Sequence, residues 1–395
     1  MGSHPAASAD KISKGILVTM LRLYTFVALL HVLIGWRLVP DMPSTAAAAA
    51  MILWLIASTA LIPFALAARR IKRRALATGL MWAGLLALGS FSSLFVLTII
   101  RDVALLIGAA TSALLHLNSM PALQSYSALA VPALAALFTL LGFINARRPA
   151  RVRSVDVPIV GLPPALHGFS IAQISDLHVG PTIKRDYVDA IVDAVNRLGA
   201  DLIAVTGDLV DGSVAQLAHH TQPMARLSAR HGAYFVTGNH EYYSGAPAWV
   251  TELRRLGLRV LINEHVVLEH EGVDIIVAGV TDYSAHHFDE AHRSDPHAAI
   301  AGAPEGAAVR LLLAHQPRSA LAAAPAGFDL QLSGHTHGGQ FLPWNFFVWL
   351  QQPFTAGLHR LDDLWVYTSR GTGYWGPPKR LGVPSEITHL RLVPA

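Results

Sequence analysis

The sequence predicts a protein of two parts, an N-terminal bundle of transmembrane helices followed by a layered α/β domain. Three observations predict this fold class. Apolar residues make up 52% of the 395 residues and charged residues 14%, against about 25% charged residues in an average soluble domain. Long stretches without charge fill the first 146 residues. After residue 154, short β-rich runs alternate with amphipathic stretches, which is typical of a sheet covered by helices.

Four apolar stretches are long enough to cross a membrane, since a spanning helix needs about 20 apolar residues. They lie near residues 15–37, 44–68, 76–100 and 127–146. Val103–Leu117 is shorter and predicts an interfacial or re-entrant helix. For the first stretch a cleavable signal peptide is the alternative, but three spans follow it and no small-residue cleavage site is evident. We therefore interpret residues 1–146 as a membrane anchor, 147–154 as a basic linker and 155–395 as a second domain.

The charge distribution indicates how the anchor is oriented. Residues 1–150 contain twelve basic and three acidic residues, whereas 151–395 contain eighteen basic and twenty-three acidic residues. Four crossings place the basic clusters on one side, which the positive-inside rule makes cytoplasmic. Because the positive charge belongs to the anchor, a nucleic-acid-binding function loses its main support.

Other classes of protein are excluded or disfavoured by particular residue types. The chain has no cysteine, which rules out disulfides, thiolate zinc sites and thiol nucleophiles. No predicted span carries Asp or Glu in its middle, which argues against a proton-coupled transporter. Arg101 and Asp102 lie at the end of a span, and we expect them to form a local ion pair at the outer interface.

The second domain is interpreted as six strands and three helices in alternation. The strands are Phe169–Ser175, Asp201–Thr206, Ala233–Thr237, Val273–Ala278, Val309–Ala314 and Phe328–Ser333, and the helices are Arg185–Leu198, Ala215–Arg230 and Pro247–Leu256. Such alternation predicts buried strands in a layered domain.

Polar residues of metal-binding types follow five of these strands. They are Asp176 with His178, then Asp208, then Asn239 with His240 and Glu241, then His315, and finally His335 with His337. In open α/β sheets, ligands bind beyond the carboxyl ends of the strands, so we expect these side chains to meet at one rim. The pairs Asp176/His178 and His335/His337 are two residues apart, which in extended chain points both side chains to one face.

This set of side chains favours a dinuclear metal centre. Two carboxylates, four imidazoles and an amide are too many for one four-coordinate zinc ion. They suit two divalent ions that share a carboxylate, with Mn²⁺, Fe or Zn²⁺ plausible by ligand softness. Two ions about 3.5–4 Å apart acidify a bridging water and clamp the oxygens of an in-line phosphoryl displacement. Phosphoester hydrolysis follows, although aminopeptidase chemistry is also allowed. Six further histidines lie in polar segments and do not directly follow a predicted strand, so they are assigned no role: His219, His220, His286, His287, His292 and His297.

The ordered blocks resemble those of the calcineurin-like metallophosphoesterase superfamily. The blocks are Asp176-Leu177-His178, Gly207 to Gly212 (GDLVDG), Gly238-Asn239-His240-Glu241, His315, and Gly334 to Gln340 (GHTHGGQ). Together with the multi-span front, SDLHVG and GTGYWGPPKRLG are similar to bacterial membrane-associated members. The resemblance implies a β-sandwich with flanking helices, a place in a bacterial inner membrane, and attack on the phosphorus by a metal-bridging hydroxide.

Residue by residue, the resemblance implies a role for each member of the set. One ion would be held by Asp176, His178, Asp208 and His337, and the other by Asp208, Asn239, His315 and His335, so that Asp208 bridges. Mn²⁺ is the expected metal, with Fe, Zn²⁺, Mg²⁺ and Ni²⁺ as alternatives. His240 would be the catalytic, non-ligand imidazole near the leaving group, a role that suits a side chain able to give and take protons.

For residues next to these motifs, the sequence leaves more than one role possible. Glu241 or another acid would orient His240, and Asp211 would brace its loop. Gly212 stands where the serine/threonine phosphatases of the superfamily carry Arg, which disfavours phosphoprotein substrates. Lys379 and Arg380 are candidates to contact substrate, with solvation at the surface as the favoured alternative.

Four spans predict a substrate in or near the bilayer, so the expected partners are membrane lipid and a phosphorylated small molecule or lipid. Two apolar groups support this expectation, with core packing as the alternative: the first is Trp344, Phe346, Phe347, Trp349 and Leu350, and the second is Tyr374 and Trp375. Some family members cleave the pyrophosphate of UDP-2,3-diacylglucosamine in lipid A synthesis, which gives a concrete alternative substrate. A catalytically silent membrane receptor or scaffold and a transporter with a regulatory domain are the alternatives of another class.

Overall fold

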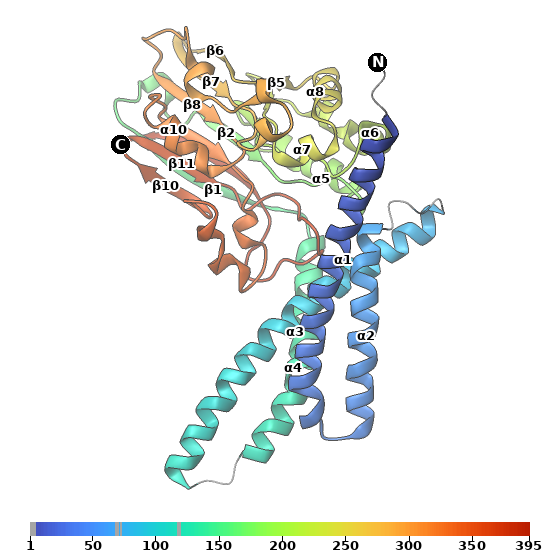
Figure 1. Ribbon diagram of the computed structural model, residues 1–395. Helices are drawn as coiled ribbons and strands as arrows, with labels where there is room; N and C mark the ends of the chain where they lie inside the picture. Colours follow the sequence, from blue (N-terminus) through green and yellow to red (C-terminus); the bar gives the residue numbers. More distant parts are fainter. Residues whose placement is uncertain (1–4, 68–70, 72, 117–119) are drawn as a thin grey trace. The chain divides into compact units, whose positions relative to one another are not determined.

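The computed structural model describes residues 5–67, 71, 73–116 and 120–395. The chain forms two compact units (Figure 1). The first unit contains the chain up to Leu141 together with Gly376–Pro378, and the second contains Gly142–Trp375 and Lys379–Ala395. Each unit contains its own buried apolar clusters.

Long helices dominate the first unit. Within the described residues they are α1 (Pro5–Leu38), α2 (Thr45–Ala67), α3 (Arg74–Leu115) and α4 (Met120–Arg147). Three segments of the described chain are long and apolar enough to cross a membrane: Thr45–Ala65, Ala75–Leu115 and Met120–Arg147. The span predicted near 15–37 falls within α1, but the side chains of residues 15–20 are outside the described part. A fourth crossing therefore remains a prediction.

The prediction of a separate interfacial or re-entrant helix at 103–117 is wrong. Helix α3 continues without interruption to Leu115, because the charges in its second half have partners on α1 and on the 3₁₀ turn after it. Arg101 forms a salt bridge with Asp41, and Asp102 forms one with Arg37 at 2.9 Å. The local pair expected between Arg101 and Asp102 is a longer contact, with 3.9 Å between Nη1 and Oδ1.

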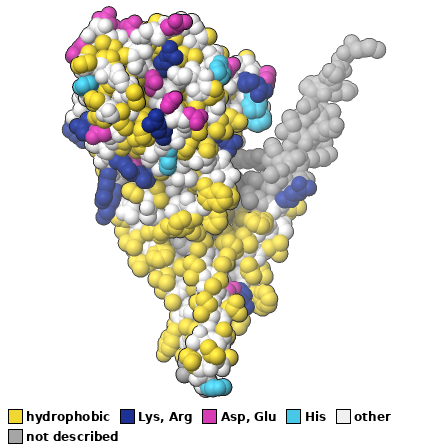
Figure 2. All heavy atoms as spheres, turned by 90° about the vertical axis from the view of Figure 1, so that its left-hand side faces the viewer, with side chains coloured by type: hydrophobic (Ala, Val, Ile, Leu, Met, Phe, Trp, Pro, Cys, Tyr) yellow, Lys and Arg dark blue, Asp and Glu magenta, His cyan; other side chains and the backbone are white. Residues whose placement is uncertain are grey.

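The surface of the helical unit is apolar, as a lipid-facing surface requires. Figure 2 shows hydrophobic side chains covering most of its exposed face. Leu53, Ile56 and Leu106 are each more than 60% exposed. A smaller set, including Ile34, Leu38 and Leu94, is buried between the helices. Because the exposed residues are as apolar as the buried ones, water is an unfavourable surrounding for this unit.

Small residues allow α2 and α3 to approach closely. A Cβ atom added at Gly84 would lie 2.5 Å from the carbonyl oxygen of Leu61 and 2.6 Å from Cβ of Ala65. Glycine at this position therefore brings two backbones together, as small residues do between membrane helices.

We expect Gly84→Leu to destabilise the helical unit by about 1–3 kcal/mol, because the new side chain must push α2 away. Gly79→Leu is the matched control, since among the described residues nothing lies within 4 Å of a Cβ added there. Thermal unfolding in detergent measures both. Equal midpoints for the two variants would contradict the close contact of α2 and α3.

The second unit is built on two six-stranded sheets. The first has the order β1-β12-β2-β3-β4-β5 and the second β10-β11-β9-β8-β7-β6. In the first sheet the strands are β1 (Arg151–Ile159), β2 (Ser170–Ile174), β3 (Leu202–Val205), β4 (Ala233–Phe235), β5 (Arg259–Val260) and β12 (Glu386–Pro394). In the second they are β6 (Glu264–His270), β7 (Val273–Gly279), β8 (Val309–Leu313), β9 (Leu330–Ser333), β10 (Gly357–Leu361) and β11 (Leu364–Thr368).

The two sheets pack face to face, with helices on the outer faces. On β3, Leu202 and Ala204 belong to the apolar cluster between the sheets, whereas Ile203 and Val205 belong to the cluster under the helices. This alternation follows from the period of two in a strand. Helices α5 (Arg185–Asn196), α6 (Val214–Thr221) and α8 (Ala246–Arg255) cover the first sheet, and α9 (Pro296–Ile300) and α10 (Ala320–Ala323) cover the second. The β-sandwich with flanking helices is thus observed.

All six predicted strands form, and further strands complete the sheets. The helix predicted at 215–230 is shorter than expected: α6 ends at Thr221 and a 3₁₀ turn follows at Gln222–Arg226. Pro223 lacks the N–H that a continuing helix needs, so it ends α6. Of the residues expected to form a basic linker, Arg147 is the last residue of α4 and Arg151 is the first of β1, which pairs in parallel with β12.

Candidate metal centre

The candidate ligands follow strands of both sheets, and hydrogen bonds hold the two rims together. Strands β2, β3 and β4 are parallel neighbours in the first sheet, and β8 and β9 are parallel neighbours in the second. The side chain of Gln173 on β2 donates to the carbonyl oxygen of Ser333 on β9 at 2.9 Å. Nδ1 of His315, after β8, lies 2.7 Å from the carbonyl oxygen of Thr206, after β3. The carboxyl ends of both sheets therefore meet at one place.

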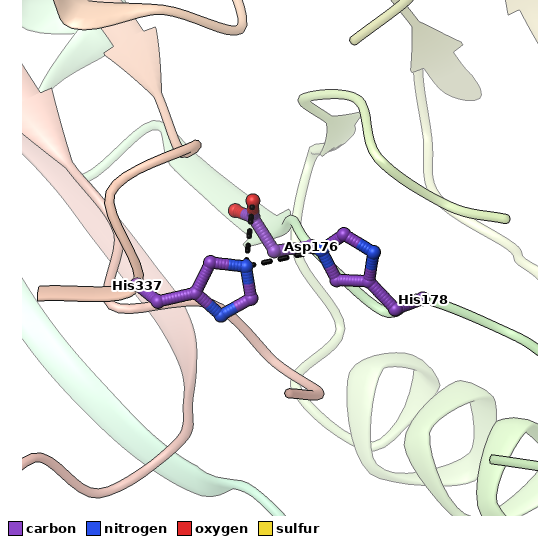
Figure 3. Close-up of side chains that lie close together, drawn as sticks. All are labelled: Asp176, His178 and His337. Atoms are coloured by element: carbon purple, nitrogen blue, oxygen red, sulfur yellow. Dashed lines mark hydrogen bonds and ion pairs between the residues drawn. The ribbon is translucent and has the colours of Figure 1, made fainter. Parts of the chain in front are cut away.

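Asp176, His178 and His337 form a first cluster (Figure 3). Nε2 of His337 is 3.3 Å from Oδ1 of Asp176 and 3.0 Å from Nε2 of His178. One candidate ligand atom from each residue lies within 4.8 Å of the others, and all three residues are buried. Two imidazole nitrogens face each other here beside a carboxylate. A cation between them would accept the lone pairs of both nitrogens and the charge of the carboxylate.

Asp208 joins this cluster to a second one. Its Oδ2 is 3.0 Å from Nε2 of His315 and 3.9 Å from Nε2 of His178. Nδ1 of His335 lies 3.3 Å from Nε2 of His315, which completes the second cluster of Asp208, His315 and His335. One carboxylate thus reaches both groups, which is the position that the expected bridging role requires.

The remaining expected ligand, Asn239, begins α7 (Asn239–Ser244) and is buried. Its Oδ1 has no hydrogen-bond partner within the described chain. A buried amide oxygen without a partner is costly, and a cation would satisfy it. The site's oxygen and nitrogen donors therefore fit two divalent ions, with no sulfur required.

The backbone of the site is strained at several candidate ligands. Positive φ angles occur at Asp176 (55°), His178 (51°), Asp208 (52°), His335 (68°) and His337 (50°). For residues with a side chain this left-handed conformation costs about 1–3 kcal/mol each, and it concentrates at functional sites. The same conformation at five converging residues indicates that the loops are shaped for ligation and not for their own stability.

Two glycines are required by the carboxylates. A Cβ atom at Gly238 would lie 2.2 Å from Oδ1 of Asp208, and one at Gly334 would lie 2.2 Å from Oδ2 of Asp176. Such distances leave no room for any side chain. Gly238 therefore lets its loop approach Asp208, and Gly334 lets its loop approach Asp176. The sequence alone does not distinguish these glycines from those of ordinary turns.

Asp211 has a larger role than the loop brace predicted for it. Its Oδ1 lies 3.0 Å from Nδ1 of His178 and 2.6 Å from Nδ1 of His240. Burial raises the pKa of Asp211, but His178 and His240 together hold that pKa well below its usual range. An ionised carboxylate accepts Nδ1–H from both rings, so Nε2 of each is left to face the site. Asp211 is thus the acid that orients His240.

Glu241 instead braces the loop after β3. Its buried carboxylate accepts hydrogen bonds from the backbone N–H groups of Asp208 (2.9 Å), Leu209 (2.8 Å) and Gly238 (2.7 Å). Of the two possibilities that the sequence leaves open, Glu241 or another acid, the structure selects another acid, Asp211. Glu241 is adjacent to His240 in the sequence, but side chains of consecutive residues on a helical turn point in different directions.

The expectation that Lys379 and Arg380 are solvated at the surface is also wrong, since both are buried. Nη2 of Arg380 lies 3.1 Å from Nδ1 of His337, and Nη1 donates to the carbonyl oxygen of Arg370 at 2.7 Å. Burial lowers the pKa of Arg380 to about 10, which leaves it cationic at neutral pH. Burial, followed by His178 and Arg380, lowers the pKa of His337, so this imidazole stays neutral as a metal ligand must.

Two exposed aromatic residues lie beside His240. Its ring centroid is 5.2 Å from that of Tyr243 and 5.8 Å from that of Trp375. Tyr243 is 63% exposed and Trp375 is 54% exposed. Large aromatic side chains that remain exposed next to a buried polar centre are typical of a binding surface.

Comparison with known proteins agrees with this geometry. Residues 169–339 match the family of calcineurin-like phosphoesterases. The chain is 40% identical over 278 residues to a bovine (Bos taurus) transmembrane protein with metallophosphoesterase domain, covering 66% of this chain and 62% of that protein. It is 34% identical to an uncharacterized metallophosphoesterase of Campylobacter jejuni, covering 63% of this chain and 64% of that protein. It is 32% identical to one of Aquifex aeolicus, covering 60% of this chain and 89% of that protein.

These similarities and the site define a metallophosphoesterase domain attached to helices able to cross a membrane. The chain belongs to the calcineurin-like metallophosphoesterase family. It spans about three fifths of the length of the bovine and Campylobacter relatives.

We expect Glu241→Gln to lower the free energy of unfolding by about 1.5–3 kcal/mol, because one carboxylate oxygen becomes an NH₂ group that faces backbone N–H donors. Chemical denaturation of the metal-free protein measures this change without reference to activity. Glu264→Gln is the control, since the side chain of Glu264 is 51% exposed. Equal stability of the two variants would show that Glu241 does not brace the loop.

Proposed function

We propose that the chain is a membrane-anchored phosphohydrolase with two divalent cations, acting on a phosphoester or pyrophosphate bond of a lipid-linked or membrane-proximal substrate. The observation that carries the proposal is the contact of one carboxylate, Asp208, with both histidine clusters. Asp176, His178, Asp208 and His337 would hold one ion, and Asp208, Asn239, His315 and His335 the other. Mn²⁺ is the metal we propose, and we propose that the domain faces the cytoplasm of a bacterial cell.

When bound, the ions supply an activated water and neutralise charge on the phosphoryl oxygens. The protein's own residues supply orientation and proton transfer. The backbone N–H of His240 donates to Oδ1 of Asp208 at 2.9 Å, which places the start of α7 against that carboxylate. With Nδ1 held by Asp211, Nε2 of His240 is the ring atom available to give a proton to a leaving oxygen.

The anchor and the aromatic flank support a substrate of mixed polarity. Helices able to cross a membrane keep the domain at a lipid surface. Trp375 and Tyr243 border His240, so the group that leaves next to His240 would meet an apolar wall. A phosphate that carries an acyl or isoprenoid chain matches both features. A comparison of membrane lipids with and without the protein identifies the phosphorylated species that accumulates.

Asp208→Asn and His240→Ala separate metal binding from proton transfer. With added Mn²⁺ the protein is expected to hydrolyse bis-p-nitrophenyl phosphate. Asp208→Asn should lose both bound metal and turnover, because it removes the shared ligand. His240→Ala should keep its metal and lose about 10²–10⁴-fold in kcat. Elemental analysis and release of p-nitrophenol are the two measurements.

Matched variants control for charge and backbone. Asp362→Asn makes the same change at another residue of positive φ, and His287→Ala removes an exposed imidazole. Both should behave as the unmodified protein. Two bound ions without turnover of any phosphate ester would favour a silent receptor or scaffold over an enzyme.

Asp211→Asn should lower metal affinity or kcat by about 10–100-fold while leaving the fold intact, because an amide holds neither imidazole in the required form. Asp186→Asn, on the exposed first turn of α5, is the control. Titration with Mn²⁺ and the pH dependence of kcat measure the change. Unaltered affinity and an unaltered pH profile would contradict the orienting role of Asp211.

A further inference from the structure

An uncharged aromatic segment follows the last candidate ligand. Residues 340–358 contain no Lys, Arg, Asp, Glu or His. Two short 3₁₀ helices form within them, Trp344–Phe346 and Val348–Leu350. We refer to residues 341–350 as the aromatic segment.

The aromatic segment presents its largest side chains to the outside. Six of them are between 40% and 65% exposed: Leu342, Trp344, Phe346, Phe347, Trp349 and Leu350. The alternative that this run is packed in the core is therefore wrong for these residues. Within the second group, Tyr374 is buried and only Trp375 is exposed.

Both ends of the aromatic segment are fixed to the metal centre's own loops. At the start, the side chain of Gln340 donates to the carbonyl oxygen of Trp375 and accepts from its N–H, each at 2.9 Å. At the end, the buried Gln352 donates to Oε1 of Gln316 at 3.1 Å, and Gln316 directly follows His315. The exposed side chains are thus held rigidly, and not on a free loop.

The close packing of the aromatic segment also depends on the ligand motif. A Cβ atom at Gly339 would lie 2.1 Å from Cα of Asn345, so only glycine fits two residues after His337. The backbone N–H of Leu342 donates to the carbonyl oxygen of Leu381 at 3.1 Å, and this bond fixes the exit from the motif. An exposed apolar surface that is held in place beside the candidate metal centre marks an interaction site.

We infer that the aromatic segment is a membrane-docking surface that inserts into the headgroup region of the bilayer and holds the mouth of the metal centre against it. Tryptophan, phenylalanine and leucine are side chains that settle at the membrane–water interface. The bilayer is within reach because only residues 148–150 separate the end of α4, a helix able to cross a membrane, from β1. The four Cα–Cα steps from Arg147 to Arg151 span at most about 14 Å.

The absence of cysteine from the chain allows a direct test. Phe347→Cys and, as control, Val267→Cys each give the full-length protein a single thiol for a nitroxide label. Phe347 is 51% exposed and Val267, on the outer strand β6, is 42% exposed. Each labelled protein is reconstituted in vesicles of phosphatidylcholine and phosphatidylglycerol, and relaxation by oxygen and by a water-soluble nickel chelate is compared.

The label at 347 should be relaxed more by oxygen, which concentrates in lipid, and the label at 267 more by the nickel chelate. Equal access of nickel to both labels would overturn the inference. Dipolar broadening between labels at 347 would also overturn it, since this result assigns the surface to a second copy of the chain. Neither outcome depends on activity, so docking and the proposed hydrolase function fail separately.

A kinetic test connects docking to the proposed function. The triple variant Phe346→Ser, Trp349→Ser, Leu350→Ser should lower kcat/KM for p-nitrophenyl hexadecyl phosphate in vesicles by about tenfold, because apolar contacts that attach the site to lipid are removed. Hydrolysis of the soluble bis-p-nitrophenyl phosphate should not change. An equal effect on both substrates, or on neither, would contradict a role in docking.

Discussion

The burial of two carboxylates, Asp176 and Asp208, determines which residues can surround the candidate metal centre. Each lies at the end of a central strand and takes a left-handed backbone conformation, and each is approached by a glycine whose Cβ would collide with it. Burying two acids together is unfavourable unless positive charge or donors surround them. Histidines from both sheets and backbone N–H groups provide these partners. The same arrangement that makes the acids tolerable in the fold makes them suited to divalent cations.

Much of this organisation is predictable from the sequence, for physical reasons. Strands buried on both faces must be apolar throughout, so runs such as 202–205 are recognisable, and the polar residues that follow them are exceptions that need an explanation. Helices able to cross a membrane are recognisable from length and lack of charge alone. Both signals are local, since each depends on residues that are adjacent along the chain.

The contacts that the sequence did not predict are those between distant segments. Nothing local distinguishes Asp211 from Glu241 as the partner of His240, because the choice depends on where α7 places each side chain. Arg380 is buried where its guanidinium contacts Nδ1 of His337, a residue more than forty positions away in the sequence. Strand β1 is rich in arginine and exposed along much of its length, so it resembles a linker until its pairing with β12 is known. The sequence predicts that a span ends at Arg101 and Asp102, whereas partners on other segments let α3 continue.

The ion pairs of the helical unit bear on how such a protein enters a membrane. Arg37 and Asp41 belong to α1 and the turn after it, whereas Arg101 and Asp102 belong to α3. Each of these two segments therefore carries one cation and one anion. These four residues give neither segment a net charge, even without the partners on the other segment. A charge that enters the hydrocarbon without a partner of opposite sign is costly. A segment that carries both signs has a smaller cost of this kind, and the pairs between segments join α3 to α1 and the turn after it.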